Sequence, residues 1–509
     1  YKPGPVPLDE EAAKTWIYPD NPDHRPRDYQ LQATEMAINH NTLVSLPTGL
    51  GKTLIAAATM YNYYRWFPTG KVVFCAPTKP LVSQQLTSCY DIMGVPAEHT
   101  AEIMGGQYGG KEARVRYWRE RRLFFCTPQT IDKDIDAGRC TTKSIVCIVI
   151  DEAHKATGDY SYVKIIDKIN QSGAKFRVLA LSATPGTKQK SIEVVVANLR
   201  ISRIFARSDE DPDVKKYIHD RQDEVIVVPQ TAAISSIEHL LESIAGPYVK
   251  QLRSLNANPY MRGGLSSTVT YLVNKARKEY NSRPHSVNLD HAFNVVSAFV
   301  ECRSEIRVSG ISGVKRRLRA MQQKNSFGKI TKSDEFQELW QQVEKLTAGG
   351  KEAELATNLK LNNPKLEKLD GILAEHFERT KAAGESSRVI VFTEKRDTIR
   401  DVLSVIECLR PLVRPHMFIG QGSSKNKGND NDDDDEDDDG NDMVAKGMKQ
   451  REQKDVIRRF RQGDLNVLVA TSIGEEGLDI GEVDLIVNFT TSSSCTRMIQ
   501  RRGRTGRKR

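Results

Sequence analysis

Short apolar runs alternate with amphipathic stretches of helix length over residues 28–207 of the 509-residue chain. The runs are rich in Val and Ile and mostly apolar on both faces, which is typical of strands buried in a parallel sheet between layers of helices. The pattern returns after residue 363, so we predict two α/β domains. The predicted strands are 43–46, 72–76, 123–126, 145–150 and 178–181 in the first domain, and 389–392, 417–419, 467–470 and 485–489 in the second.

The block between these two regions has few strand-like runs, and its stretches 234–245 and 290–306 have helical periodicity. Pro364 opens the next segment and marks a boundary. We therefore predict a first domain at 1–228, an α-helical insertion domain at 229–362 and a second α/β domain at 363–509. The apolar runs are far shorter than the roughly 20 residues that cross a bilayer.

The net charge of +9 conceals an uneven distribution. Ten acidic residues lie within the thirteen positions 430–442, and the rest of the chain would carry +19 without them. We predict that the low-complexity stretch of about 421–449 is a disordered insertion, because its charges repel and almost nothing apolar is available to bury. The basic remainder suits a phosphate-rich partner.

The eight cysteines are scattered, without a C-x-x-C pair or a His/Cys cluster at metal spacing. This pattern favours a reducing intracellular compartment and gives no support for a structural zinc site. The chain begins at Tyr1 rather than Met and has no signal peptide, so we expect it to be a fragment of a longer protein.

The strand at 43–46 runs into a Gly-rich turn and then into a helix-forming stretch at 54–58. In such a turn, glycines let backbone N–H groups approach the phosphates of ATP, and the helix N-terminus favours the anion. The lysine reaches the β- and γ-phosphates and the following threonine binds Mg²⁺. The general P-loop pattern has Gly where this chain has Leu46, but the flanking strand and helix argue against a chance match. The turn reads Pro47-Thr48-Gly49-Leu50-Gly51-Lys52-Thr53.

The apolar strand at 145–150 ends in Asp151-Glu152-Ala153-His154. An acidic pair at this place lies at the carboxyl edge of the sheet, where ligands of such folds bind. We predict that Asp151 holds Mg²⁺, that Glu152 deprotonates the attacking water, and that His154 couples the site to neighbouring motifs. An isolated acidic pair would more often cap a helix, but the P-loop in the same domain favours the catalytic interpretation.

A basic run near the end of the chain reads Gln500-Arg501-Arg502-Gly503-Arg504-Thr505-Gly506-Arg507. Alone, such a run is typical of a solvated face or a localisation signal. Its glycine spacing and paired arginines favour arginine fingers, with Arg504 and Arg507 neutralising the γ-phosphate during transfer. Gln500 belongs to the same predicted catalytic group. Hydrolysis would then require the two α/β domains to close on each other.

These motifs occur in the order found in the superfamily 2 DEAH-box helicases, which the chain resembles over most of its length. The resemblance implies two RecA-like domains, an adenine contact for Gln30, and nucleotide contacts for Gly477 and Asp479. It also implies four threonines that contact the phosphates of one nucleic-acid strand, although a lone threonine at a strand end is more often a turn or cap residue. These are Thr78, Thr127, Thr393 and Thr471. The other matching segments are Tyr29-Gln30, Ala76-Pro77-Thr78, Cys126-Thr127-Pro128, Ser182-Ala183-Thr184, Val391-Phe392-Thr393 and the run 470–479.

The helical block between the motor domains, the segment 217–221 and the form of the last two motifs are similar to the Fanconi anaemia group M DNA translocases and their archaeal Hef relatives. The acidic insertion suits a fungal member. This resemblance implies ATP and Mg²⁺ as cofactors, branched DNA as the partner, 3′ to 5′ movement, a role in DNA repair and a nuclear location. Basic clusters in the block at 275–278 and 315–319 suit duplex backbone, or equally a solvated helix face.

Two other functions stay open. Dicer-like and RIG-I-like motors also place helices between their motor domains, so the chain could act on RNA. A catalytically idle nucleic-acid scaffold with a relic motor is the third interpretation. Scaffolds usually lose a carboxylate, the P-loop lysine or an arginine finger, and this sequence has all of them.

Overall fold

The structure is a computed structural model. It describes residues 4–19, 25–105, 110–184, 186, 189–218, 222–254, 263–282, 289–348, 352–420, 448–471, 480, 481 and 483–490. The chain divides into two compact units, the first formed mainly by Tyr1–Gln222 and the second mainly by Asp223–Ile473 with Leu485–Thr491.

A seven-stranded sheet forms the centre of the first unit, and all of its neighbouring strands are parallel. Its strand order is β3-β4-β2-β5-β6-β1-β7. The parallel sheet is the one that the apolar runs predicted, whereas the edge strands β3 and β7 were not predicted. The strands are β1 (Thr42–Ser45), β2 (Lys71–Cys75), β3 (Thr100–Ile103), β4 (Leu123–Cys126), β5 (Ile145–Ile150), β6 (Arg177–Ser182) and β7 (Arg203–Ala206).

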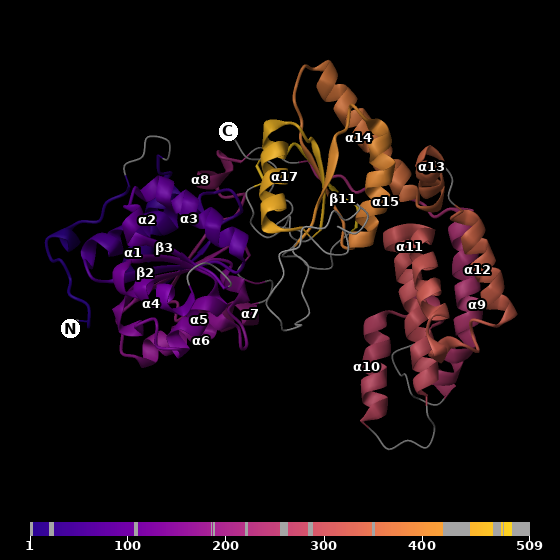
Figure 1. The fold of residues 1–509 in the computed structure, drawn as a ribbon, viewed down its shortest axis with the longest axis horizontal. Helices are drawn as coiled ribbons and strands as arrows, with labels where there is room; N and C mark the ends of the chain where they lie inside the picture. Colours follow the sequence, from indigo (N-terminus) through magenta and orange to yellow (C-terminus); the bar gives the residue numbers. More distant parts are fainter. Residues whose placement is uncertain are drawn as a thin grey trace. The chain divides into compact units, whose positions relative to one another are not determined.

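Helices cover both faces of this sheet (Figure 1). Because successive side chains of a strand point to opposite faces, Val72 and Phe74 belong to the apolar core under α1, α2 and α3, while Val73 and Cys75 belong to the core under α4, α5, α6 and α7. Burial on both sides explains why these strands read as continuous apolar runs. The helices are α1 (Asp28–Asn39), α2 (Lys52–Trp66), α3 (Lys79–Met93), α4 (Gly110–Glu120), α5 (Pro128–Asp136), α6 (Ser161–Gln171), α7 (Gln189–Asn198) and α8 (Pro212–Lys215).

The second unit contains a parallel sheet of four strands in the order β11-β8-β10-β9. The predicted disorder of 421–449 falls outside the described residues except at its end, where Met448 is buried and accepts a contact from the amide of Ile419. The elements are β8 (Val389–Phe392), β9 (Pro415–Phe418), β10 (Val467–Ala470), β11 (Leu485–Asn488), α14 (Pro364–Ala382), α15 (Arg396–Ile406) and α17 (Gln450–Gln462).

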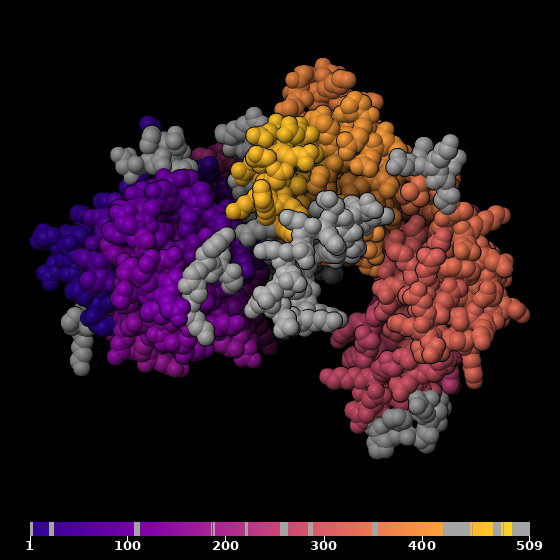
Figure 2. Space-filling view, viewed as in Figure 1, coloured from indigo at the N-terminus to yellow at the C-terminus, as the bar shows by residue number. Residues whose placement is uncertain are grey.

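The predicted helical insertion belongs to this second unit and packs around its own apolar core, which includes Phe293, Phe299 and Phe336. Its helices form one continuous body in the space-filling view (Figure 2). The long helix α11 is broken at Gly310, where φ is 65°. The helices of the insertion are α9 (Ala232–Ser254), α10 (Thr270–Asn281), α11 (Asp290–Gln322), α12 (Asp334–Leu346) and α13 (Glu352–Asn362).

The fold class is therefore as predicted: two parallel-sheet α/β regions with helices inserted between them. Among the described helices, none combines the length and the apolarity that crossing a membrane requires.

Candidate nucleotide site and nucleic-acid contacts

The predicted phosphate loop is a tight turn between β1 and α2. Gly49 and Gly51 have φ angles of 86° and 76°, which disfavour any residue with a Cβ. A Cβ on Gly51 would also overlap the side-chain amide of Gln30. α2 begins at Lys52, and the first amides of a helix have no acceptor within it. This end of α2 is therefore suited to bind an anion.

Two side chains of α1 form hydrogen bonds to the phosphate loop. The Tyr29 hydroxyl and the Gln30 side-chain amide both donate to the carbonyl of Leu50, at 3.0 and 3.1 Å, and both residues are buried. The side-chain oxygen of Gln30 accepts a hydrogen bond from the backbone amide of Arg27 at 2.8 Å. Gln30 thus has a structural role in shaping the loop, and its contact with adenine stays a prediction.

Lys52 is held at the same loop. Its ammonium donates to the carbonyls of Leu46 and Pro47, at 2.7 and 3.1 Å. Its positive charge favours the ionised form of both Asp151 and Glu152, although burial raises the pKa of Asp151 overall. The lysine of the loop and the acidic pair after β5 therefore belong to one electrostatic site.

The acidic pair follows β5 directly, next to the end of β6. Asp151 Oδ1 accepts from the amide of Glu152 at 2.9 Å, and Glu152 has a left-handed backbone with φ 51°. The Nδ1 atom of His154 lies 3.2 Å from Glu152 Oε2 and 3.4 Å from Ser182 Oγ. Ser182 opens the predicted Ser-Ala-Thr motif, so His154 contacts both motifs, as its predicted coupling role requires.

The two carboxyls differ in pKa. Burial and the neighbouring charge of Glu152 raise the pKa of Asp151 well above its usual value. Burial also acts to raise the pKa of Glu152, but the nearby imidazole of His154 and the charge of Lys52 lower it below its usual value. Glu152 is therefore ionised at neutral pH and able to accept a proton.

Gln85 on α3 is a site residue that the sequence reasoning missed. Its side-chain oxygen accepts from the Thr53 hydroxyl at 2.9 Å, and its amide donates to Asp151 Oδ2 at 3.4 Å. It therefore links the two predicted Mg²⁺ ligands across the sheet edge. No local motif points to Gln85; only its burial beside the site identifies it.

The four threonines predicted to contact nucleic acid all follow a strand, but they differ in exposure. Thr78 directly precedes α3 and is partly exposed, whereas Thr127 and Thr471 are buried. Thr393 is completely buried, and its hydroxyl donates to the carbonyl of Lys395 at 3.5 Å. Their phosphate contacts stay predictions.

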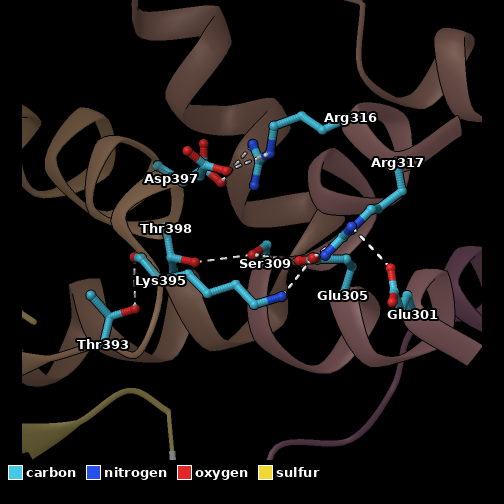
Figure 3. A network of polar contacts seen from close by, with 10 residues as sticks. Glu301, Glu305, Ser309, Arg316, Arg317, Thr393, Lys395, Asp397 and Thr398 are labelled. Carbon is cyan, nitrogen blue, oxygen red and sulfur yellow. Dashed lines mark hydrogen bonds and ion pairs between the residues drawn. The ribbon is translucent and has the colours of Figure 1, made fainter. Parts of the chain in front are cut away.

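Part of the predicted basic cluster at 315–319 is occupied by ion pairs. Arg316 lies 3.7 and 3.6 Å from carboxylate oxygens of Asp397 and Asp401 on α15. Arg317 contacts Glu301 and Glu305 within α11 (Figure 3). Arg316 therefore helps to hold α11 of the insertion against α15, whereas the ion pairs of Arg317 stay within α11.

A buried network, which we call the joint network, completes this contact (Figure 3). Glu305, with only 8% of its side chain exposed, accepts from Lys395 at 2.5 Å, from Arg317 at 3.2 Å and from Ser309 at 3.3 Å. Ser309 in turn lies 3.0 Å from the hydroxyl of Thr398 on α15. Lys395 stands two residues after Thr393, so the network reaches the end of β8.

The predicted nucleotide contacts of Gly477 and Asp479 lie outside the described residues, as do Gln500, Arg504 and Arg507.

Comparison with known proteins matches residues 23–187 to the family described as type III restriction enzyme, res subunit, and residues 438–509 to the helicase conserved C-terminal domain. The solved Hef helicase domain of Pyrococcus furiosus is 29% identical and superimposes with a TM-score of 0.65. The match covers 95% of this chain and 93% of the Hef chain. Together with the phosphate loop and the acidic pair on one parallel sheet, these matches agree with the resemblance to the superfamily 2 helicases.

Two curated relatives narrow the family. The chain is 38% identical over 99% of its length to the "DEAD-box ATP-dependent RNA helicase FANCM" of Arabidopsis thaliana, and 37% identical over 99% to the "ATP-dependent DNA helicase fml1" of Schizosaccharomyces pombe. It spans 36% and 58% of these proteins. The chain is similar over almost its whole length to the FANCM, fml1 and Hef helicases, which confirms the resemblance given by its motifs.

Proposed function

We propose that this chain is the ATP-hydrolysing motor of a DNA helicase or translocase that remodels branched DNA during repair. The observation that carries the proposal is the link from Thr53 through Gln85 to Asp151, which ties the phosphate loop to the acidic pair. A loop that binds phosphates beside an ionised glutamate is the arrangement that hydrolysis of ATP requires.

The chain's own groups would act in a definite order. The N-terminal amides of α2 and the ammonium of Lys52 bind and orient the phosphates. Glu152, whose pKa is lowered by His154 and Lys52 against the effect of burial, takes the proton of the attacking water. Arg504 and Arg507 would supply positive charge to the γ-phosphate during transfer.

The residues at the site fit a magnesium ion bound with ATP. Thr53 offers a hydroxyl and Asp151 a buried carboxylate, and both are the hard oxygen donors that Mg²⁺ prefers. Mg²⁺ would neutralise phosphate charge during transfer. Among the described residues no group of three or more His, Cys, Asp and Glu side chains could hold a metal ion.

The basic remainder of the chain suits a nucleic-acid track, and the name of the Schizosaccharomyces relative, a DNA helicase, favours DNA. Branched structures, 3′ to 5′ movement and a nuclear location belong to the same proposal. An RNA track is the second candidate, because the Arabidopsis relative is named an RNA helicase. An idle scaffold is the third, but Lys52 and both carboxylates of a hydrolytic site are in place.

The experiment compares ATP hydrolysis by the purified chain with forked DNA, duplex RNA and no nucleic acid. Forked DNA is expected to stimulate turnover, and Lys52→Ala to abolish it while DNA binding persists. Stimulation by RNA alone would contradict DNA as the track, but ATP hydrolysis by this chain would still be supported. Turnover that survives Lys52→Ala would contradict the site, and no turnover under any condition would favour the scaffold.

A further inference from the structure

A cavity of about 390 Å³ lies in the second unit where the insertion meets the second sheet. Four parts of the chain converge on it: the connector before α9, helix α11, the start of α14, and the residues after β8 and β11. We call it the joint pocket. Its polar lining residues are Gln230, Ser304, Arg307, Asn363, Lys365, Glu394 and Thr490.

Two cations line the joint pocket without a carboxylate partner. The Lys365 ammonium donates to the backbone carbonyl of Arg307 at 2.7 Å. Among the described residues, neither the guanidinium of Arg307 nor the ammonium of Lys365 forms an ion pair, in contrast to the neighbouring Arg317 and Lys395. Burial and the charge of Arg307 lower the pKa of Lys365. An anion bound here would relieve this repulsion.

The pocket offers further donors to an anion. It lies at the N-terminus of α14, a helix of 19 residues, where the helix dipole favours negative charge. Asn363, only 4% exposed, lines the pocket, and its Nδ2 atom has no acceptor within the described structure. Glu394 is the one carboxylate among the polar lining residues, and it is solvent-exposed. Two cations and a helix N-terminus outweigh this single negative charge.

We propose that the joint pocket binds a phosphodiester of the nucleic-acid strand through Arg307 and Lys365. The inference rests on the proposed function, because it names where the strand's backbone is held. Thr393, the residue predicted to contact phosphate at the end of β8, is buried with its hydroxyl on Lys395. Glu394 follows it and already lines the pocket. We therefore infer that Arg307 of α11 and Lys365 of α14, and not Thr393, contact the phosphate near the end of β8.

This placement has a consequence for the insertion. Arg307 comes from the insertion, whereas Lys365 belongs to the first helix after it. One phosphate would thus join the insertion to the second α/β region, beside the joint network that Glu305 organises. The insertion then contributes to holding the strand through the pocket, and not only through its outer basic surface.

The test measures binding of forked DNA to the full chain as a function of salt, for Arg307→Gln, Lys365→Gln and the wild type. Each substitution should weaken binding roughly tenfold, as expected for one charge-assisted hydrogen bond. Each should also reduce the slope of log affinity against log salt by about one. Lys381→Gln is the matched control, because it removes the same charge from the exposed far end of α14. Hydrolysis of ATP without DNA should be unchanged in all three.

Arg307→Gln keeps the test valid if Lys365→Gln unfolds, because the exposed Arg307 side chain has no partner to lose in the described structure. If all three variants weaken DNA binding equally, or if none weakens it, the proposal that the joint pocket binds a phosphodiester would be overturned. Phosphate or ATP that protects Arg307 from modification, without loss of DNA affinity in the variants, would assign the pocket to a free anion and overturn the proposal. A wild-type chain that binds no nucleic acid would overturn the proposed function as well. DNA binding that the variants leave intact would overturn the pocket alone.

Discussion

The nucleotide site and the joint network both bury carboxylates, but they treat them in opposite ways. Glu305 in the joint accepts from three donors, and Lys395 and Arg317 hold its pKa below the usual value although burial acts to raise it. At the nucleotide site Glu152 has a strained backbone, and its Oε2 atom lies near His154 without an aligned hydrogen bond. Asp151 there has a raised pKa.

The difference distinguishes a site that binds a ligand from a contact that stabilises the fold. A fully paired buried network fixes one arrangement of the elements around it. Strain and unsatisfied polar atoms persist only where the surrounding fold enforces them, and they gather at functional sites. Substitution of a carboxylate should therefore reduce activity at the first region and stability at the second.

The largest effect should come from Glu152→Gln. Removal of the base that accepts the water's proton is expected to lower nucleic-acid-stimulated ATP hydrolysis by about 10²–10⁴-fold. The free energy of unfolding should change by less than about 1 kcal/mol, because Oε2 has no donor to lose in the described structure. Steady-state turnover and chemical denaturation measure the two quantities. A variant that is mainly unstable, with turnover per folded molecule unchanged, would contradict the division of roles.

The candidate residues of the nucleotide site could be located in the sequence because they follow apolar strands directly, and their roles stay predictions. Strands at 145–150 and 389–392 agree with β5 and β8 to the residue. The edge strands β3 and β7 were not predicted because they include Glu102 and Arg203 and therefore lack a continuous apolar run. In an edge strand only one side pairs, and the hydrophobic signal is weaker.

Contacts between distant parts of the chain could not be predicted. Gln85 is 32 residues from Thr53, and the hydrogen bond from Lys395 to Glu305 spans 90 residues. The helix predicted at 290–306 continues to Gln322, past a break at Gly310. A Cβ at Gly310 would come within 2.6 Å of the carbonyl oxygen of Asn362, so this glycine serves a tertiary contact that no local pattern reveals.

A smaller effect, on stability alone, should follow from Glu305→Gln. Three donors lose their charged acceptor, and we expect the free energy of unfolding of the second unit to fall by about 2 kcal/mol, an estimate reduced for the partial exposure of Lys395 and Arg317. Glu301→Gln is the matched control, one turn earlier on α11 and with a single exposed ion pair to Arg317. Its cost should stay below about 1 kcal/mol.

The pH dependence of this difference has a definite sign. Because the pKa of Glu305 is lower in the folded state, its contribution is present above the ordinary pKa of glutamate, about 4.3. The gap between wild type and Glu305→Gln should therefore be constant near neutral pH and shrink as the pH falls below that value. Denaturation curves at several pH values measure it. A gap that grows on acidification would contradict the paired state of Glu305.

The smallest effect should be a gain in stability from Asp401→Asn, in the same contact between α11 and α15. Burial raises the pKa of Asp401 to about 6, and the attraction of Arg316 only partly offsets this. A carboxyl with a raised folded pKa is favoured when protonated, so its stability contribution is lost as pH rises through about 6. The asparagine variant avoids this loss. At a pH of about 7.5 it should be more stable than wild type by roughly 1 kcal/mol, and the gap should close towards a pH of about 4.

Asp397→Asn is the control for this last prediction, because Asp397 contacts the same Arg316 but has 63% of its side chain exposed. It should change the free energy of unfolding by less than about 0.5 kcal/mol at any of these pH values. A loss of stability in Asp401→Asn near neutral pH would mean that its ion pair with Arg316 outweighs the cost of burial. Asp401 would then resemble Glu305, and the contact between α11 and α15 would contain no carboxylate held at a cost.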